Sequence, residues 1–430
     1  MRILHYSLGF PPKRTGGLVT YTIDLMNEQI KNGDSVFFLY PANINFFKKN
    51  THIQFDSKRS SNRFYPYALI NSLPLSLIGG IKNPKDFMKP VDKKIYYNFL
   101  KEIKPDVIHV HTLMGLHKEF FECAKTLGIK TVFTSHDYFG LAPEPSFFFQ
   151  GENYDQHNTL DQWIKISKES MPTWKLRLFQ TSIYPTIRWI MNRARPEKVS
   201  MIVKKEKRPT SKTTKKEIRK AFDCLKAYYC SIFHLIDFFH FNSQLAFNVF
   251  RNNIPLDNNY SCVSITNASV KEHLVTGRKA AHKKTKIAYI GPYKNYKGFF
   301  EFLKLPKILG TEKYEYHTYG SNAKFEFPKS IVNHGRYTRK DEVYENIDII
   351  IVPSLWKETF GFVTVEALSY NKIVLVSKNV GSKELIDNNF IFRTVKDIPK
   401  QLKYVKSYRI KQQKKMSDHY LEIKKIYNGS

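Results

Sequence analysis

The chain has 430 residues, of which 42% are hydrophobic, so it has enough apolar material for two or three domains and is not expected to be disordered throughout. Its formal net charge is +31, from 69 Lys and Arg against 38 Asp and Glu. Such a surface attracts nucleic acid, anionic lipid headgroups or phosphorylated substrates, and charge alone does not choose among them. The four cysteines form no CxxC pair, which indicates free thiols in a reducing compartment.

The sequence predicts no membrane anchor. Its first residues read as a strand rather than a signal peptide, and no apolar run reaches the roughly 18 residues of a membrane span. The nearest approach, residues 65–81, is broken by prolines; it either lies on a membrane surface or forms an ordinary buried loop and helix. We therefore expect a cytoplasmic protein that is peripheral on the inner face of the plasma membrane.

The first 140 residues alternate between strand and helix patterns. A helical spacing starts at Leu18, and Asn32-Gly33 suits its C-terminal cap. Apolar strands that alternate with helices predict a parallel sheet covered on both faces. The expected strands are residues 2–7, 35–40, 106–112 and 130–137, with a second helix over 116–127.

The alternation stops between about residues 140 and 230. Residues 163–226 contain 18 Lys and Arg against 5 Asp and Glu. Two interpretations remain open: a solvated helical insertion, or a basic face for anionic lipid or for a pyrophosphate-bearing acceptor. Trp163, Trp174 and Trp189 favour helices at an interface.

A second alternating pattern follows a basic linker over residues 273–284. We expect two Rossmann-like, doubly wound α/β domains, residues 1–270 and 271–405, that face each other across a cleft. A C-terminal helix over 406–430 packs back on the first domain. Ligands of such sheets bind outside the carboxyl ends of the strands, which both domains direct toward this cleft.

The stretch "KETFGFVTVEAL", residues 357–368, joins a buried strand to a helix through a glycine. Gly361 permits close backbone approach to a phosphate or a sugar. Glu366, one turn inside the helix, suits vicinal hydroxyls, as acidic residues do for nucleotide ribose, and Glu358 does the same for a hexose. Alternatively, both glutamates are surface charges.

Two other turns carry features that suit anion binding. Lys297 opens a helix in "IGPYKNYKG" and is expected to neutralise a diphosphate, with Lys294 as a second candidate. The alternative is that both lysines are solvated. Gly16 and Gly17 in "PPKRTGG" suit an anion or a nearby sugar at a helix entrance. This segment is neither a Walker A loop nor a GxGxxG motif.

Histidines also end strands of the first domain. His136 in "SHDY" is expected to face the cleft, where it binds a sugar hydroxyl or carries a proton, or else only caps its strand. His109 and His111 occupy alternate positions, which suits packing. The sequence has no Asp-x-Asp and no His/Cys cluster with metal spacing, so it requires no catalytic metal. The aromatic residues form no nucleic-acid motif, and we expect no nucleic-acid partner.

Together these segments resemble the retaining, nucleotide-sugar-dependent glycosyltransferases of family 4, which have the two-domain GT-B fold. Residues 353–387 are the most specific part, and "GPYKNYKG", "PPKRTGG", "PDVIHVH" and "SHDY" fall in the expected order. The long basic insertion is most similar to members that build bacterial surface polysaccharides. In this chain Gly291-Pro292 stands where the family usually has Gly-Arg, and Asn267-Ala268 where it has Asn-Gly.

The resemblance implies a role for each matching residue. Glu366 would bind the ribose, Glu358 would approach the donor sugar, and His136 would lie near the transferred sugar. The remaining donor-side residues would be Gly16, Gly17, Lys294, Lys297, Tyr337, Phe360, Gly361 and Phe362. The missing Arg at position 292 puts the affinity for the diphosphate in question, and Lys294 or Arg14 are candidates to compensate.

The sequence hypothesis is thus a retaining, metal-independent glycosyltransferase without a cofactor. It would move a sugar from a nucleotide diphosphate, most simply UDP, to a hydroxyl of a lipid-linked or polysaccharide acceptor at an anionic membrane surface. The alternative is a non-catalytic subunit of the same fold in a membrane-associated glycan-assembly complex. A phosphorylase-like enzyme would need a phosphate or cofactor pocket instead of a ribose-binding glutamate.

Overall fold

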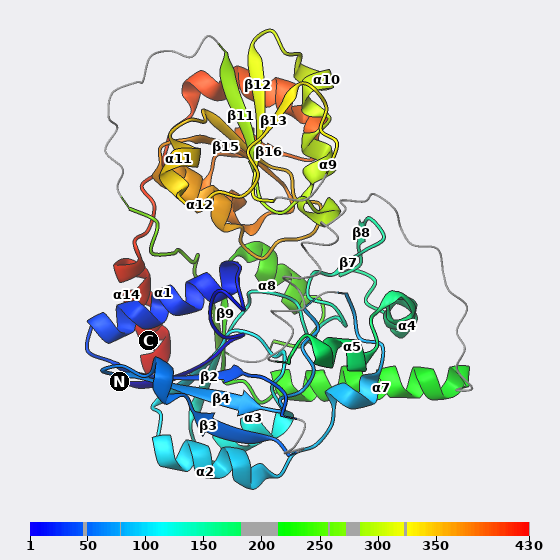
Figure 1. Ribbon diagram of the computed structural model, residues 1–430, viewed down its shortest axis with the longest axis vertical. Helices are drawn as coiled ribbons and strands as arrows, with labels where there is room; N and C mark the ends of the chain where they lie inside the picture. The colour runs from blue at the N-terminus through cyan, green and yellow to red at the C-terminus, as the bar shows by residue number, and fades with distance from the viewer. Residues whose placement is uncertain are drawn as a thin grey trace.

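The computed structural model describes residues 1–45, 50–77, 79–181, 214–256, 259–271, 284–321 and 325–429. It shows two α/β domains, one above the other in Figure 1, with the first running from blue to green and the second mainly yellow and orange. Much of the predicted basic insertion, including Trp189, and nearly all of the linker lie outside the described residues.

The first domain is built on an eight-stranded sheet in the order β10-β9-β6-β5-β1-β2-β4-β3 within the described residues. Its neighbours are parallel except for β3 and β4. The central strands are buried on both faces, since consecutive residues of β1 and β5 are buried, and β1 pairs with β2 along one edge and with β5 along the other. The strands are β1 (Arg2–Tyr6), β2 (Ser35–Pro41), β3 (His52–Phe55), β4 (Phe64–Ile70), β5 (Val107–Val110), β6 (Lys130–Thr134), β9 (Phe238–Phe241) and β10 (Asn259–Cys262).

Helices cover both faces of this sheet, and a short hairpin lies beside them. Polar side chains begin several helices: the Asp92 carboxylate accepts from Lys94 N, and Thr214 forms a reciprocal cap with Glu217. The hairpin strands are β7 (Phe148–Phe149) and β8 (Glu152–Asn153). The helices are α1 (Gly17–Lys31), η1 (Ser57–Arg59), η2 (Pro84–Phe87), α2 (Lys93–Ile103), α3 (Lys118–Thr126), α4 (Leu160–Glu169), α5 (Thr173–Leu178), α7 (Lys215–Phe233) and α8 (Gln244–Arg251).

In the described part of the second domain, six strands form a parallel sheet in the order β13-β12-β11-β14-β15-β16. Its strands are β11 (Thr285–Ile290), β12 (Tyr314–Tyr319), β13 (Ile331–Asn333), β14 (Ile349–Val352), β15 (Ile373–Ser377) and β16 (Ile391–Phe392). Its helices are η3 (Asn295–Lys297), α9 (Phe299–Phe302), α10 (Leu305–Leu309), α11 (Lys340–Tyr344), α12 (Phe362–Ser369), η4 (Gly381–Leu385), η5 (Asn388–Phe390), η6 (Val395–Asp397), α13 (Ile398–Gln401) and η7 (Leu402–Ser407).

The apolar stretch over residues 65–81 confirms one part of its sequence interpretations, the buried loop, but it begins with a strand and shows no helix in its described residues. Its first part is β4, which pairs in parallel with β2 and antiparallel with β3. Leu73 and Leu75, which follow the strand, are buried in the core of the first domain. In its described residues the stretch is therefore an internal strand followed by a buried loop, and its buried leucines are not available to a membrane surface. The prolines were expected to break the stretch, but Pro66 lies within the strand, beside Phe38 of β2.

The chain returns to the first domain at its C-terminus. Helix α14 (Met416–Asn428) lies beside α1, red against blue in Figure 1. Tyr21 OH lies 2.8 Å from His419 Nε2, and Lys130 Nζ donates to the carbonyl oxygen of Ile426 at 2.6 Å. This helix thus covers the sheet of the first domain, to which it contributes buried polar groups.

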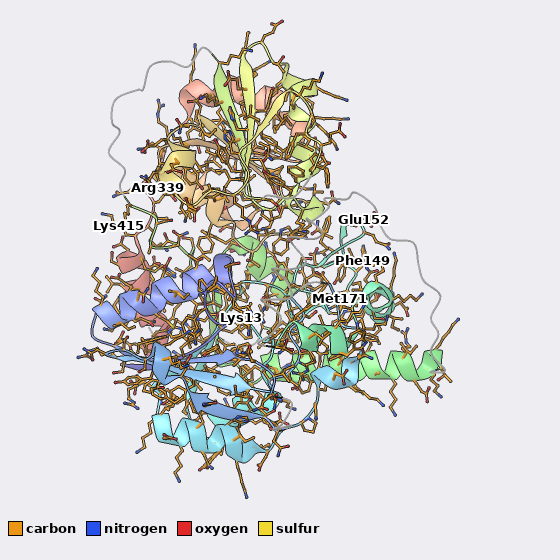
Figure 2. The ribbon with its side chains drawn as sticks, viewed as in Figure 1. Lys13, Phe149, Glu152, Met171, Arg339 and Lys415 are labelled. Atoms are coloured by element: carbon orange, nitrogen blue, oxygen red, sulfur yellow. The ribbon has the colours of Figure 1, made fainter. Side chains whose placement is uncertain are left out.

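Polar contacts join the two domains on the side of the hairpin. The hairpin carries Phe149 and Glu152, which Figure 2 shows below the second domain. Asn153 Nδ2 donates to Leu355 O at 2.8 Å, and Lys357 Nζ pairs with Asp155 Oδ2 at 2.6 Å. The domains are therefore in direct contact around the turn that follows β14.

Across the described ranges, no helix is both long enough and apolar enough to span a bilayer.

Candidate active site

The turn between β14 and α12 is fixed by its backbone. Glu358 N donates to Asn379 O, and Ser382 N donates to Phe360 O, each at 2.8 Å. Gly361, the residue before α12, has φ +95°, and a Cβ there would lie 2.8 Å from Val380 Cγ1. The position therefore requires glycine, because both its conformation and its surroundings exclude a side chain.

Glu366 is buried inside α12 and binds groups from both domains. Its Oε1 accepts from Lys340 Nζ and from Asn267 Nδ2, each at 2.7 Å, and Tyr344 OH donates to Oε2 at 3.2 Å. Lys340 Nζ also donates to Ser269 Oγ at 2.8 Å. A carboxylate has about four acceptor sites, so these three bonds leave capacity for a further donor such as a hydroxyl.

Lys297 and Glu358 form a half-buried ion pair. Their Nζ and Oε1 atoms are 2.6 Å apart, and the ammonium lies 5.0 Å from the ring centroid of Trp356. The next residue, Gly298, has φ +74°, and a Cβ there would collide with the carbonyl oxygen of Pro353. This close packing sets the start of α9 against the end of β14 and brings the lysine to the glutamate.

His136 is half-buried at the domain junction. Its carbonyl oxygen accepts from Thr359 Oγ1 at 3.0 Å, and its ring lies 4.8 Å from that of Tyr21. Burial and the neighbouring His240 and His419 lower the pKa of His136 to about 3, so the imidazole is neutral at pH 7. Burial raises the pKa of the adjacent Asp137 to about 7.

The two glycines of "PPKRTGG" begin α1 opposite the second domain. A Cβ on Gly17 would lie 2.8 Å from Cδ2 of Phe362, which begins α12. Gly16 has φ +116° with open space where its side chain would be. Phe360 is buried together with residues of the first domain. The starts of α1 and α12 therefore meet, and the absence of a side chain on Gly17 allows the close approach.

The other predicted donor-side residues lie on the second domain. Tyr337 is half-buried, and burial together with the charge of Glu366 raises its pKa to about 12. Lys294 is exposed and precedes the turn that carries Lys297. Pro292 is exposed, and its carbonyl accepts from Tyr289 OH at 2.6 Å. The lysine that the structure pairs with a glutamate of the turn is thus Lys297.

Sequence reasoning missed Lys340 and Asn267. Both lie far from Glu366 along the chain, and nothing in the local pattern separates Lys340 from the many other lysines. The only sequence signal near Asn267 was Ala268, which stands where the family usually has glycine. The backbone of Ala268 has a structural role, because its N–H donates to Asp24 Oδ2 at 2.8 Å.

Two buried polar groups at the junction lack hydrogen-bond partners among the residues that the structure describes. They are the hydroxyl of Tyr138 and the indole Nε1 of Trp356, whose rings lie 6.3 Å apart on opposite domains. Buried polar atoms are nearly always paired with protein, water or ligand. These two groups therefore mark a place beside Glu358 where a polar ligand or water would be stabilised.

Three histidines of the first sheet come together although the sequence shows no metal spacing. Nitrogens of His5, His109 and His111 all lie within 4.8 Å of one another, close enough for a shared ion. However, every ring nitrogen of the three already has a hydrogen-bond partner, so an ion would have to displace these bonds. The cluster is described more simply as a buried hydrogen-bonded network.

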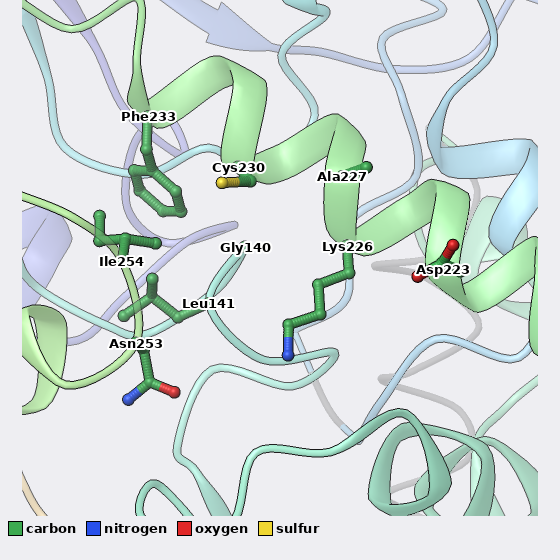
Figure 3. Close-up of a pocket in the computed structure, with 9 residues that line it drawn as sticks. All are labelled: Gly140, Leu141, Asp223, Lys226, Ala227, Cys230, Phe233, Asn253 and Ile254. Atoms are coloured by element: carbon green, nitrogen blue, oxygen red, sulfur yellow. The ribbon is translucent and has the colours of Figure 1, made fainter.

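A separate cavity of about 250 Å³ lies against α7 in the first domain (Figure 3). Lys226 and Asn253 extend toward it from opposite sides, and Gly140 and Leu141 line it between them. None of the predicted donor-side residues lines it. This cavity is therefore distinct from the turn at the domain junction that carries Glu358 and Glu366.

Comparison with known proteins gives two family models and one relative along nearly the whole chain. Residues 271–418 match "Glycosyl transferases group 1", and residues 15–195 match "Glycosyltransferase Family 4". A Klebsiella pneumoniae protein described as "Uncharacterized 42.6 kDa protein in cps region" is 24% identical over 410 residues, which cover 92% of this chain and 91% of that protein.

Solved structures share the fold at low sequence identity. An α,α-trehalose-phosphate synthase (UDP-forming) from Burkholderia xenovorans has a TM-score of 0.56 at 10% identity, covering 99% of this chain and 100% of that one. Anabaena HepE in complex with UDP has a TM-score of 0.54 at 11% identity, covering 99% and 95%. These matches establish the two-domain arrangement only.

Proposed function

Because the chain belongs to the group 1 and family 4 glycosyltransferases of GT-B fold, related to a protein of a capsule (cps) region, we propose that it is a retaining enzyme that uses a nucleotide diphosphate sugar. The proposal rests mainly on the side chains that come together at the domain junction. Glu366, the Lys297–Glu358 pair and His136 come from both domains and lie around one turn.

On the donor side, Glu366 would accept hydrogen bonds from the ribose hydroxyls with the capacity that its three protein donors leave. Lys297 would move from Glu358 to the diphosphate, whose leaving charge it stabilises without a metal. Glu358 and His136 would then face the sugar. Closed domains exclude water and so suppress hydrolysis of the donor.

UDP is the proposed carrier, with support from structural neighbours alone. HepE from Anabaena has been solved with UDP and with UDP-glucose, and the Burkholderia enzyme is named as UDP-forming. The donor's base and sugar in this protein follow by analogy of fold.

The proposed acceptor is a hydroxyl of a lipid-linked or polysaccharide glycan at an anionic membrane surface. The cps-region relative supports a role in capsule synthesis. The charge of +31 supports an anionic partner. On α5, Trp174 and Leu178 are 61% and 47% exposed beside Lys175, which suits contact with headgroups.

The first experiment is a thermal-shift panel with UDP, GDP, ADP and CMP. We expect one diphosphate to raise Tm, by about 2.7 kcal/mol of added stability at 100 times its Kd, and Glu366→Ala to abolish the shift. Glu342→Ala is the matched control, because Glu342 is exposed on α11 and makes only a surface ion pair with Arg339.

The outcomes separate the two candidate functions. A shift that survives in Glu366→Ala would remove Glu366 from the donor site. No shift with any nucleotide, in a protein that also transfers no sugar, would favour the non-catalytic subunit of a glycan-assembly complex.

A further inference from the structure

One chain of hydrogen bonds runs through the first domain from His136 to a backbone carbonyl. The first three links join His136 Nε2 to His111 Nδ1 (3.3 Å), His111 Nε2 to His5 Nδ1 (2.9 Å) and His5 Nε2 to Gln29 Oε1 (2.7 Å). The next two join Gln29 Nε2 to Tyr427 OH (3.2 Å) and Tyr427 OH to His109 Nδ1 (2.7 Å). The last three join His109 Nε2 to Thr134 Oγ1 (2.6 Å), Thr134 Oγ1 to His240 Nδ1 (2.9 Å) and His240 Nε2 to Val263 O (2.8 Å).

The last link sets a direction, because a carbonyl oxygen can only accept. His240 Nε2 must therefore carry the proton that it donates to Val263 O. The imidazole is neutral, since burial lowers the pKa of His240 to about 3. Its Nδ1 is consequently an acceptor, and the single hydroxyl proton of Thr134 is donated to it.

Each hydrogen bond whose direction is known fixes the direction of the next one. Because the hydroxyl proton of Thr134 is donated to His240, the Thr134 oxygen accepts from His109 Nε2–H, which leaves His109 Nδ1 as an acceptor for the hydroxyl of Tyr427. The phenol oxygen of Tyr427 then accepts a hydrogen bond from the amide Nε2–H of Gln29. The amide is thereby oriented with its Oε1 toward His5, whose Nε2 carries the proton.

The remaining steps reach the domain junction. His5 Nδ1 is left as an acceptor, so His111 donates to it from Nε2 and accepts at Nδ1 from His136. Burial lowers the pKa of His5 to about 4 and also depresses that of His111, so neither ring carries a second proton at pH 7. In the reversed direction the chain would place two acceptors, His240 Nε2 and Val263 O, 2.8 Å apart.

We propose that Gln29 and Tyr427 are positioning residues that hold His136 in its Nε2–H tautomer, leaving Nδ1 as a hydrogen-bond acceptor at the domain junction. The structure describes no partner for that nitrogen, and it is not among the fully buried polar atoms that lack one. A ligand of this nitrogen must therefore bring a hydrogen-bond donor, such as a hydroxyl. That this hydroxyl belongs to a sugar rests on the proposed function; the tautomer does not.

The test measures the tautomer directly in the full-length protein without substrate. In protein labelled with ¹⁵N-histidine, long-range ¹H–¹⁵N correlation reports which ring nitrogen of His136 is protonated, and His136→Gln assigns its signals. We expect a protonated Nε2 and a bare Nδ1. A proton on Nδ1 of wild-type His136, or one equivalent of zinc bound to the purified protein, would overturn the proposal.

Tyr427→Phe tests the coupling. It removes the hydroxyl that orients the amide of Gln29, so both tautomers of His136 should appear, and an equal mixture would lower kcat/KM about twofold. Tyr420→Phe is the matched control on the same helix, because the buried hydroxyl of Tyr420 donates to Asp34 Oδ2 at 2.9 Å and takes no part in the chain of hydrogen bonds from His136 to Val263. It should keep the wild-type tautomer.

If Tyr427→Phe does not fold, Thr134→Val breaks the same chain from β6 and should give the same mixture. An unchanged tautomer in a folded Tyr427→Phe or Thr134→Val protein would contradict the proposed role. Because the tautomer is measured without a sugar donor, its result is independent of the glycosyltransferase proposal.

Discussion

At the scale of single residues, the candidate site depends on where side chains are absent as much as on where charges are present. Gly17, Gly298 and Gly361 each occupy a place where a Cβ would meet another segment. These contacts bring the starts of helices against strand ends and against the opposite domain. The charged groups then fall into place: Lys297 reaches Glu358 only because Gly298 lets the chain pass close to Pro353.

Gly298→Ala should be far more destabilising than Gly128→Ala. Both glycines have similar backbones, with φ of +74° and +67°, so the conformational strain is about 1–3 kcal/mol in each case. Only Gly298 has a carbonyl oxygen where the methyl group would be, whereas Gly128 has open space. We expect Gly298→Ala to cost at least about 2 kcal/mol more, measured as the shift of the urea unfolding midpoint. Equal shifts would show that Pro353 moves freely.

At the scale of elements, short helices carry surfaces that the strand–helix alternation does not reveal. Helix α5 exposes Trp174 and Leu178, while Trp163 on α4 is fully buried and its Nε1 donates to Asn158 Oδ1 at 2.6 Å. The sequence placed these two tryptophans in one class. The difference arises because α4 packs against α7, a partner about 50 residues further along the chain.

Trp174→Ala should weaken binding to vesicles that contain anionic lipid. The exposed indole beside Lys175 would be the group that enters the headgroup layer, so its loss removes apolar area while the charge is unchanged. Co-sedimentation with vesicles measures the effect. Leu421→Ala is the control, since Leu421 is 57% exposed but lies on α14. Equal binding of both variants and the wild type would leave α5 without a membrane role.

At the scale of the whole molecule, the buried histidines join the C-terminal helix to the first sheet. His419 and Tyr427 on α14 contact Tyr21 and His109, respectively. A helix at the end of the chain therefore completes the polar interior of the domain at its beginning. The stability of the first domain should consequently depend on keeping this interior uncharged.

Stability should fall steeply as the pH drops from about 6.5 to 4. Burial lowers the pKa of His5 to about 4 and of His136 and His240 to about 3, so below pH 6.5 the unfolded chain binds more protons than the folded one. Each such histidine costs about 1.4 kcal/mol per pH unit across that window. Nine histidines of the described residues have a lowered pKa: His5, His109, His111, His117, His136, His240, His317, His334 and His419.

The opposite effect comes from fewer groups. Burial raises the pKa of four carboxyls, so as the pH falls the folded state takes up protons on them before the unfolded chain does: Asp24, Asp137, Glu144 and Glu384. Urea unfolding at pH 7, 6 and 5 measures the balance. His240→Gln should reduce the slope, and His157→Gln, at an exposed position, should not. A midpoint that stays constant or rises toward pH 5 would contradict the prediction.

The sequence by itself determined many of the elements and their order, because hydrophobic periodicity and glycine turns are local signals. Strands β1, β2, β5, β6 and β14 and helices α1, α3 and α12 lie where their patterns placed them. It also predicted that the turn over residues 357–361 links a strand end to a helix. Local pattern failed at β4, where prolines in a buried strand read as a break.

The tertiary structure alone decided which side chains meet. Lys340 and Asn267 bind Glu366 from 26 and 99 residues away, and Tyr427 reaches His109 across 318 residues. Such distances carry no periodic signal, because the partners come together only when sheets pack and domains close. The tautomers of the buried histidines also depend on the tertiary structure. They follow from the carbonyl of Val263, which only folding brings within hydrogen-bond distance of His240.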